Sequence, residues 1–270
     1  MTVTNAVETT MIWGTVSGAS MVGMVISLLL SVGLPIFLCI FIYKKTKAWV
    51  PAFFIGCGIF VGFAMILEQI CHAIVLTVTG SAIRDNIWLY AIYGGLAAAL
   101  FEECGRWIAM KFCLKKHLTR ENALMYGAGH GGIEAFLILG MSSMSNLLTA
   151  AMINGGLMEK TMTALEPAQQ EVTYHQLSVL WTTPAYQFYL APVERISAIA
   201  LQIALSILVY SAVKTGRKLQ LAAAFGLHFA VDFLTVICAS MIPTWALELG
   251  LLVVVAVICA AVYKLSLIHI

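Results

Sequence analysis

The chain has 270 residues, of which 61% are hydrophobic and only 10% are charged, and its formal net charge is +2. Soluble domains carry about 45–50% apolar and about 25% charged residues, so this composition excludes a soluble globule, a disordered chain and a nucleic-acid binder. At about 20 residues per span, the apolar content suffices for seven transmembrane helices with short connections. The fold class predicted from composition is therefore an all-α polytopic membrane protein.

Hydropathy along the chain predicts where these helices lie, with boundaries good to a few residues. The predicted spans cover roughly residues 15–43, 49–78, 87–112, 123–145, 186–212, 220–241 and 243–263. We interpret 1–264 as one integral membrane domain, in which an extracytoplasmic loop at about 146–185 is the one sizeable connection.

The basic residues predict the orientation of these spans. Eleven of the 15 Lys and Arg residues flank the spans on one side, whereas the opposite connections carry only Arg84 and Lys160. Because cytoplasmic loops are enriched in basic residues, this side is predicted to be cytoplasmic and the N-terminus to lie outside. Residues 1–10 contain neither Lys nor Arg, which argues against a cleavable signal peptide. We expect an integral protein of the bacterial cytoplasmic (plasma) membrane.

The last six residues form a separate case. The segment 265–270 reads Leu-Ser-Leu-Ile-His-Ile, which a common transposase sequencing adaptor encodes when it is read in frame. We therefore expect 265–270 to be a non-native, adaptor-derived tail, and we assign no role to His269.

Seven acidic residues lie inside the predicted spans, although each costs at least about 2.5 kcal/mol near the bilayer centre. They are Glu68, Glu102, Glu103, Glu134, Glu194, Asp232 and Glu248. Depth can be counted from the basic residue that ends each span on the cytoplasmic side. Glu102, His130 and His228 lie nine or ten residues from such a residue, hence about 14–15 Å above the basic boundary.

Further polar residues share this layer. Glu134 follows His130, and Asp232 follows His228, by four residues, which places each pair on one helix face. Gln202, twelve residues before Lys214, falls at a similar depth. A single buried histidine would be typical of helix packing, whereas His or carboxylate at one depth on three helices predicts an active site or an ion site.

The two adjacent glutamates are expected to have different roles. Glu102 and Glu103 point about 100° apart, so one should face the site while the other supports it from behind. Arg106, one turn below Glu102, is expected to pair with Glu102 and to hold its side chain. The glycines from 127 to 132 are expected to admit a neighbouring helix closely.

A second, outer layer of polar residues is predicted near the external interface. It consists of Glu68 with His72 on the second span and of Glu194 with Arg195 on the fifth. We interpret it as an interfacial polar network that ties helices together rather than as a site of chemistry.

Four motifs carry a resemblance to a known family. They are Glu-Glu-Cys-Gly-Arg from Glu102, Gly-His-Gly-Gly-Ile-Glu-Ala from Gly129, Glu194-Arg195, and His-Phe-Ala-Val-Asp from His228. In this order they resemble the YhfC-like intramembrane proteases, which are similar to PrsW and to the type II CAAX prenyl endopeptidases (the CPBP group). The resemblance covers about 50 to 240 and implies a CAAX-protease-like helical core.

The resemblance also implies roles for residues of this chain. The catalytic base would be Glu102, in a catalytic group with Glu103, Arg106, Glu134, His228 and Asp232. The supporting residues would be His130, Glu194, Arg195 and Gln202. The chain departs from the CAAX endopeptidase pattern in two places, because the Glu-to-Arg spacing is one residue shorter and Gln202 stands where a third-motif histidine is expected.

Charge arithmetic bears on the cofactor. Four carboxylates (Glu102, Glu103, Glu134 and Asp232) and one guanidinium (Arg106) sum to −3, which a membrane interior does not tolerate. The site must therefore retain protons or bind a cation, and both remain open. The resemblance to metal-independent CAAX enzymes favours protons. A divalent metal such as zinc suits the ligands His130, Glu134, His228 and Asp232.

The function predicted from the sequence is hydrolysis of peptide bonds by a water that Glu and His side chains activate. The expected partners are a membrane protein or lipidated peptide substrate and the lipid bilayer, with no nucleic acid. A proton- or metal-coupled transporter is the alternative, since it too needs carboxylates and histidines at mid-membrane. Such transporters are commonly built from inverted repeats, which this sequence does not show.

Overall fold

The computed structural model describes residues 11–269, without the side chains of 267–269. The predicted absence of a signal peptide at 1–10 therefore lies outside the described residues, as do Ile270 and the side chains at the end of the predicted tail. Every regular element between residues 11 and 269 is a helix. Seven of the described helical stretches are long and apolar enough to cross a membrane, which confirms the predicted all-α polytopic class and its seven spans.

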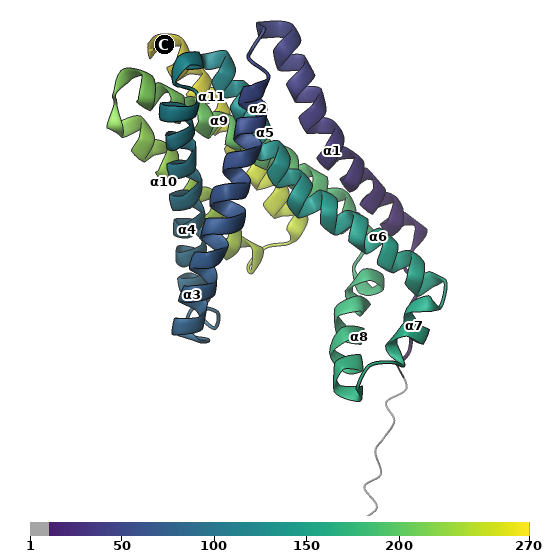
Figure 1. Cartoon of the computed structure of the whole chain (residues 1–270). Coiled ribbons are helices and arrows are strands. Elements are labelled where there is room, and N and C mark those ends of the chain that lie inside the picture. The colour runs from purple at the N-terminus through teal and green to yellow at the C-terminus, as the bar shows by residue number, and fades with distance from the viewer. Residues whose placement is uncertain (1–10, 270) are drawn as a thin grey trace, which may run out of the picture.

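The spans follow the chain order (Figure 1). They are α1 (Gly18–Thr46); α2 (Pro51–Phe60), η1 (Val61–Glu68) and α3 (Gln69–Thr79); α4 (Ile87–Ile108) and η2 (Ala109–Cys113); α5 (Arg120–Ala135), η4 (Phe136–Gly140) and α6 (Met141–Asn154); α9 (Ala185–Thr215); α10 (Lys218–Ala239); and α11 (Thr244–His269). The short η3 (Lys115–His117) joins the third span to the fourth. Three spans contain a π-helical segment, namely η1, η2 and η4.

The structure extends the fourth span beyond its predicted end near 145. The helix runs on to Asn154, and α7 (Leu157–Met162) and α8 (Pro167–Thr182) occupy much of the predicted loop. These helices are ordered by a small apolar core with the N-terminal segment, in which Ala150 and Leu180 pack with Val16. The Asn154 side chain also accepts a hydrogen bond from the backbone N–H of Val16 at 2.8 Å and donates one to its carbonyl at 2.9 Å.

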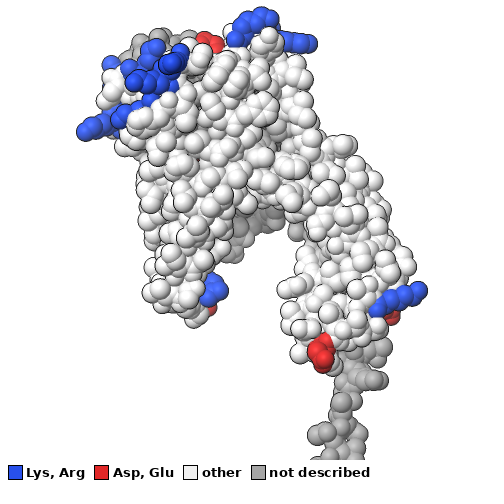
Figure 2. Space-filling view, viewed as in Figure 1, with Lys and Arg blue, Asp and Glu red and all other residues white. Residues whose placement is uncertain are grey.

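Lys and Arg gather at one end of the molecule, whereas few lie at the opposite end (Figure 2). The basic end holds the termini of α1 and α9, where Lys44, Lys45 and Lys214 lie in the last helical turns. This distribution is the one on which the predicted cytoplasmic side rests, and the orientation itself stays a prediction.

Glycine allows α5 to approach two neighbouring helices. A Cβ on Gly129 would overlap the backbone carbonyl of Phe53 in α2, and one on Gly127 would lie 2.7 Å from Cα of Ile203 in α9. These contacts require glycine, because any side chain would separate the helices. The expected close approach is therefore present, and it fixes α5 between α2 and α9.

The fifth span, α9, is the centre of the bundle. In its most apolar stretch 72% of the residues are buried, and α9 packs against α1, α5, α10 and α11. We expected the third, fourth and sixth spans alone to surround the site, and this was incomplete. A helix with apolar side chains on all faces is the one that a bundle buries, and α9 has such a sequence from Leu201 to Val213.

Candidate active site

A cavity with a volume of about 110 Å³ lies among α4, α5, α9, α10 and α11. Its polar lining consists of Glu102, Glu134, Glu194, Arg195, Gln202, His228 and Asp232. Apolar residues of α9, α10 and α11 complete the wall. The cavity thus has a polar lining within an apolar bundle and is large enough for a few water molecules.

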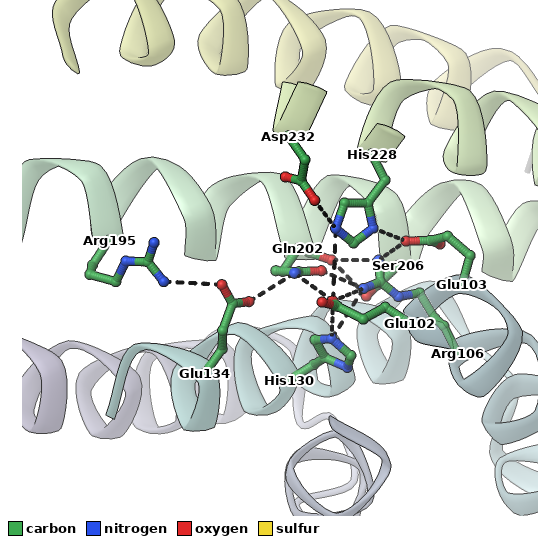
Figure 3. A network of polar contacts seen from close by, with 10 residues as sticks. All are labelled: Glu102, Glu103, Arg106, His130, Glu134, Arg195, Gln202, Ser206, His228 and Asp232. Atoms are coloured by element: carbon green, nitrogen blue, oxygen red, sulfur yellow. Dashed lines mark hydrogen bonds and ion pairs between the residues drawn. The ribbon is translucent and has the colours of Figure 1, made fainter. Parts of the chain in front are cut away.

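Glu102 projects from α4 into this cavity and is 7% exposed. Its Oε2 atom lies 2.9 Å from Nε2 of His130 and accepts a hydrogen bond from Nε2 of Gln202 at 2.8 Å (Figure 3). Its Oε1 atom has no hydrogen-bond partner within the described part of the chain. One oxygen of the carboxylate is therefore fixed, and the other is free to act on a molecule in the cavity.

Glu103 lies behind the cavity and orients His228. Nδ1 of His228 is 2.8 Å from Oε1 of Glu103, and Nε2 is 3.5 Å from Oδ2 of Asp232 and 3.9 Å from Oε2 of Glu102. Since a carboxylate only accepts hydrogen bonds, Nδ1 carries the proton in this pair. A neutral His228 therefore presents the lone pair of Nε2 to the cavity.

Gln202 connects the two carboxylates at the centre of the site. Its Nε2 atom donates to Oε2 of Glu102 and to Oε2 of Glu134, each at 2.8 Å. Its Oε1 atom accepts a hydrogen bond from Arg106, which fixes which end of the amide is the donor. The glutamine at the third-motif position is therefore the hub of the network.

The contacts of Arg106 differ from the prediction. Its Nη1 atom is 3.4 Å from Oε1 of Glu103, whereas its Nη2 atom is 3.9 Å from Oε2 of Glu102. The expected close pair with Glu102 is replaced by contacts with Glu103 and Gln202, including a 3.4 Å bond to the Gln202 carbonyl. The turn of the helix explains the difference, because Glu102 faces the cavity and Glu103 faces the fully buried guanidinium.

The outer polar layer is joined to the site by Arg195. Its Nη1 atom donates to Oε1 of Glu134 at 3.1 Å, and its Nε atom donates to Oε2 of Glu194 at 2.7 Å. On another helix, Nε2 of His72 lies 3.2 Å from Oε1 of Glu68. Nδ1 of His72 lies 2.7 Å from the Tyr93 hydroxyl, a contact that the sequence analysis missed.

The sequence analysis also missed the seventh span. Leu251 and Val255 of α11 line the cavity, and so does Thr235 of α10. Val255 lies nine residues before Lys264, the same separation that Glu102 has from Lys111. The depth count would have found Val255 if apolar residues had been included in it.

The donor atoms allow a test of whether a metal fits. Glu102, His130 and Glu134 each offer a ligand atom, and these atoms lie within 4.8 Å of one another. Nδ1 of the fully buried His130 has no hydrogen-bond partner among the described residues. Imidazole and carboxylate are ligands that zinc accepts, and the excess negative charge favours a cation. The residues present therefore fit a divalent metal.

The grouping of these ligands differs from the predicted one. His130 and Glu134 were expected to act with His228 and Asp232, but the structure groups them with Glu102. His228 and Asp232 contact each other on the α10 side of Glu102 (Figure 3).

Comparison with known proteins identifies the family. A profile described as YhfC intramembrane metalloprotease matches residues 30–258. The chain belongs to this family. The YhfC family also includes the Bacillus subtilis (strain 168) protein named "Uncharacterized membrane protein YhfC", which is 43% identical over 204 residues, or 72% of this chain and 76% of that protein. No solved structure matches the chain.

Family membership confirms part of the sequence analysis. The chain is an integral membrane protein, and its resemblance to YhfC proteins is confirmed. The relationship to PrsW and to CAAX endopeptidases remains a resemblance seen in the motifs. The family description also makes a metalloprotease the class of enzyme to which the site should be related.

Proposed function

We propose that the protein hydrolyses peptide bonds of membrane-embedded or membrane-proximal substrates, with Glu102 as the general base. The observation that carries this proposal is the asymmetry of the Glu102 carboxylate. Its Oε2 atom is held by His130 and Gln202, whereas its Oε1 atom is without a partner in the described structure and borders the cavity. A general base needs both a fixed position and a free lone pair.

The reaction follows from these positions. Oε1 of Glu102 takes a proton from a water in the cavity, and the water oxygen attacks the carbonyl carbon of the scissile bond. The resulting tetrahedral intermediate loses its C–N bond, and Glu102 returns the proton to the leaving nitrogen. The products are a carboxylic acid and an amine, so atoms and charges balance. Nε2 of His228 accepts a hydrogen bond from the attacking water and orients it.

A divalent metal, when bound, would be held by His130, Glu134 and Oε2 of Glu102, and it would polarise the scissile carbonyl and activate the water. The protein's own contribution is to place these groups. Gln202 holds the carboxylates of Glu102 and Glu134, and Glu103 holds His228. Arg195 supports Glu134 from the outer layer and takes no part in the chemistry.

The proposed setting is the bacterial cytoplasmic membrane, with the basic end in the cytoplasm and the N-terminus outside. Substrates would be membrane proteins or lipidated peptides that reach the cavity from the bilayer. Membership in a metalloprotease family favours this function over the transporter considered from the sequence.

The test compares cleavage of candidate membrane proteins in cells that express wild type, Glu102→Gln or Glu171→Gln. The last variant removes an exposed carboxylate of α8 and serves as the matched control. Loss of the general base should lower turnover about 10²-fold or more, while Glu171→Gln should leave it unchanged. Identical cleavage patterns in wild type and Glu102→Gln would remove Glu102 from the mechanism.

A further inference from the structure

Glu248 is a buried carboxylate that the proposed mechanism does not use. It lies in α11 and is only 7% exposed. Its Oε2 atom is buried and has no hydrogen-bond partner among residues 11–269. A carboxylate in this situation is costly inside a membrane protein, so an intramembrane acidic residue without a partner indicates a missing ligand.

The position of Glu248 on α11 places it above the cavity. Leu251 and Val255, three and seven residues later, lie on the same helix face and line the cavity. Val255 is level with Glu102 by its distance from the basic boundary. At 1.5 Å per residue, Glu248 lies about 10 Å further toward the opposite, extracytoplasmic end.

The charges at this outer level are not balanced. Glu248 lies close enough to Glu194 and Arg195 for their charges to interact. The guanidinium of Arg195 is already shared between Glu194 and Glu134. Three carboxylates therefore face one guanidinium, and Glu194 also lines the cavity. The rim of the cavity carries excess negative charge on the side where a substrate would continue outward.

We infer that Glu248 and Glu194 form an acidic subsite that binds a Lys or Arg side chain of the substrate. This inference rests on the proposed proteolytic function and adds a substrate class to it. An extended peptide advances about 3.3 Å per residue, so a distance of about 10 Å corresponds to about three residues. The cationic residue therefore lies about three residues from the cleaved bond, on its extracytoplasmic side.

The residues between the bond and the cation should be apolar. Leu251 and Val255 border this part of the cavity, and they offer no hydrogen-bonding groups to a polar side chain. The recognised segment is thus the outer end of a membrane span, where a short aliphatic stretch is followed by a basic residue.

Binding can be measured separately from cleavage. Purified Glu102→Gln protein in phosphatidylglycerol vesicles, which contain no lipid amine, is titrated with synthetic membrane peptides that differ only by Lys, Met or Glu at one position. That position is moved along the outer end of the span. We expect the Lys peptide to bind about tenfold more tightly than the Met peptide at one register, as for a desolvated charge pair, and the Glu peptide to bind most weakly.

The same peptides are then tested with a second substitution. In Glu102→Gln/Glu248→Gln the Lys-to-Met preference should fall to about one, whereas Glu102→Gln/Glu159→Gln, which changes an exposed carboxylate of α7, should retain it. Equal binding of the Lys and Met peptides at every register overturns the subsite, and this result needs no variant at Glu248. The same holds if the preference persists without Glu248.

The two proposals fail in different ways. Cleavage by the wild-type protein without any preference for a basic residue removes the acidic subsite and leaves the protease assignment standing. A binding preference without cleavage of any peptide keeps the subsite and removes the protease assignment. A preference lost only when amine-containing phosphatidylethanolamine is added means that lipid amines compete for the same carboxylates, which supports an ammonium-binding subsite.

Discussion

Oε1 of Glu103 lies 2.8 Å from Nδ1 of His228, although the two residues are 125 positions apart in the chain. This contact joins α4 to α10 and determines which nitrogen of His228 faces the cavity. Carboxylates that orient a functional histidine in this way typically change metal affinity or activity 10–100-fold when they are replaced.

Replacing Glu103 with Gln tests this relationship. The amide can still accept a hydrogen bond from Nδ1, but it lacks the negative charge that favours the required tautomer. We expect kcat/KM for a membrane peptide to fall about 10–100-fold with little loss of stability. The measurement is steady-state cleavage together with thermal unfolding in detergent. Unchanged cleavage would mean that Glu103 does not control His228.

Glu102→Gln should not destabilise the protein. The substitution removes one negative charge from a site that has four carboxylates and one guanidinium, and the new amide oxygen can still accept hydrogen bonds from His130 and Gln202. Removing a buried, incompletely balanced charge is commonly neutral or stabilising. We expect an equal or higher midpoint of thermal unfolding than that of wild type. A clear decrease would show that the glutamate charge is needed for folding.

Arg195→Ala should reduce stability and expression together with activity. The change leaves Glu134 and Glu194 without their shared cation in a buried setting, which costs about 3–5 kcal/mol. Arg195→Lys keeps the charge and should recover part of the loss. Unfolding in detergent and the yield of folded protein are the readouts. An Arg195→Ala protein that folds normally but is wholly inactive would contradict the supporting role.

Metal analysis separates the two groups of candidate ligands. If a divalent metal binds at Glu102, His130 and Glu134, protein purified with zinc should lose it in Glu134→Gln and keep it in Asp232→Asn. The reason is that Asp232 contacts His228 on the other side of Glu102. Metal content per protein chain is measured by elemental analysis. Loss in Asp232→Asn but not in Glu134→Gln would move the metal to the His228 side.

Gly129→Ala tests the contact between α2 and α5. The added methyl group would overlap the Phe53 carbonyl, so the helices must separate, at a cost of about 1–3 kcal/mol. Gly94→Ala is the control, because a Cβ there meets nothing within 4 Å and alanine favours the helix. Thermal unfolding should show a lower midpoint for Gly129→Ala alone. Equal midpoints for the two variants would be inconsistent with the close contact.

The depth of the polar residues could be predicted because helices are rods of constant rise with basic residues at one end. Counting from Lys111 and Lys218 placed Glu102 and His228 in one layer, and the structure brings them to 3.9 Å. The same count found Gln202, but depth alone does not reveal which helices are neighbours. The central place of α9 depends on packing between helices, which a single sequence does not display.

Other features were beyond the sequence for different physical reasons. The pairing of Arg106 depends on which of two adjacent glutamates turns toward the cavity, and this is set by the neighbouring helices. The helical region after residue 145 depends on long-range contacts such as that of Asn154 with Val16. The roles proposed for the site residues remain predictions that the substitutions above address.

The glutamine at the centre of the site has a consequence for how the protein responds to acidity. A carboxamide neither gains nor loses a proton in the range that cells experience, unlike an imidazole at the same place. Gln202 therefore keeps both of its N–H groups directed at Glu102 and Glu134 in acid and in alkali alike. The scaffold of the site is insensitive to pH, and any pH dependence of turnover must originate in the carboxylates and imidazoles around it.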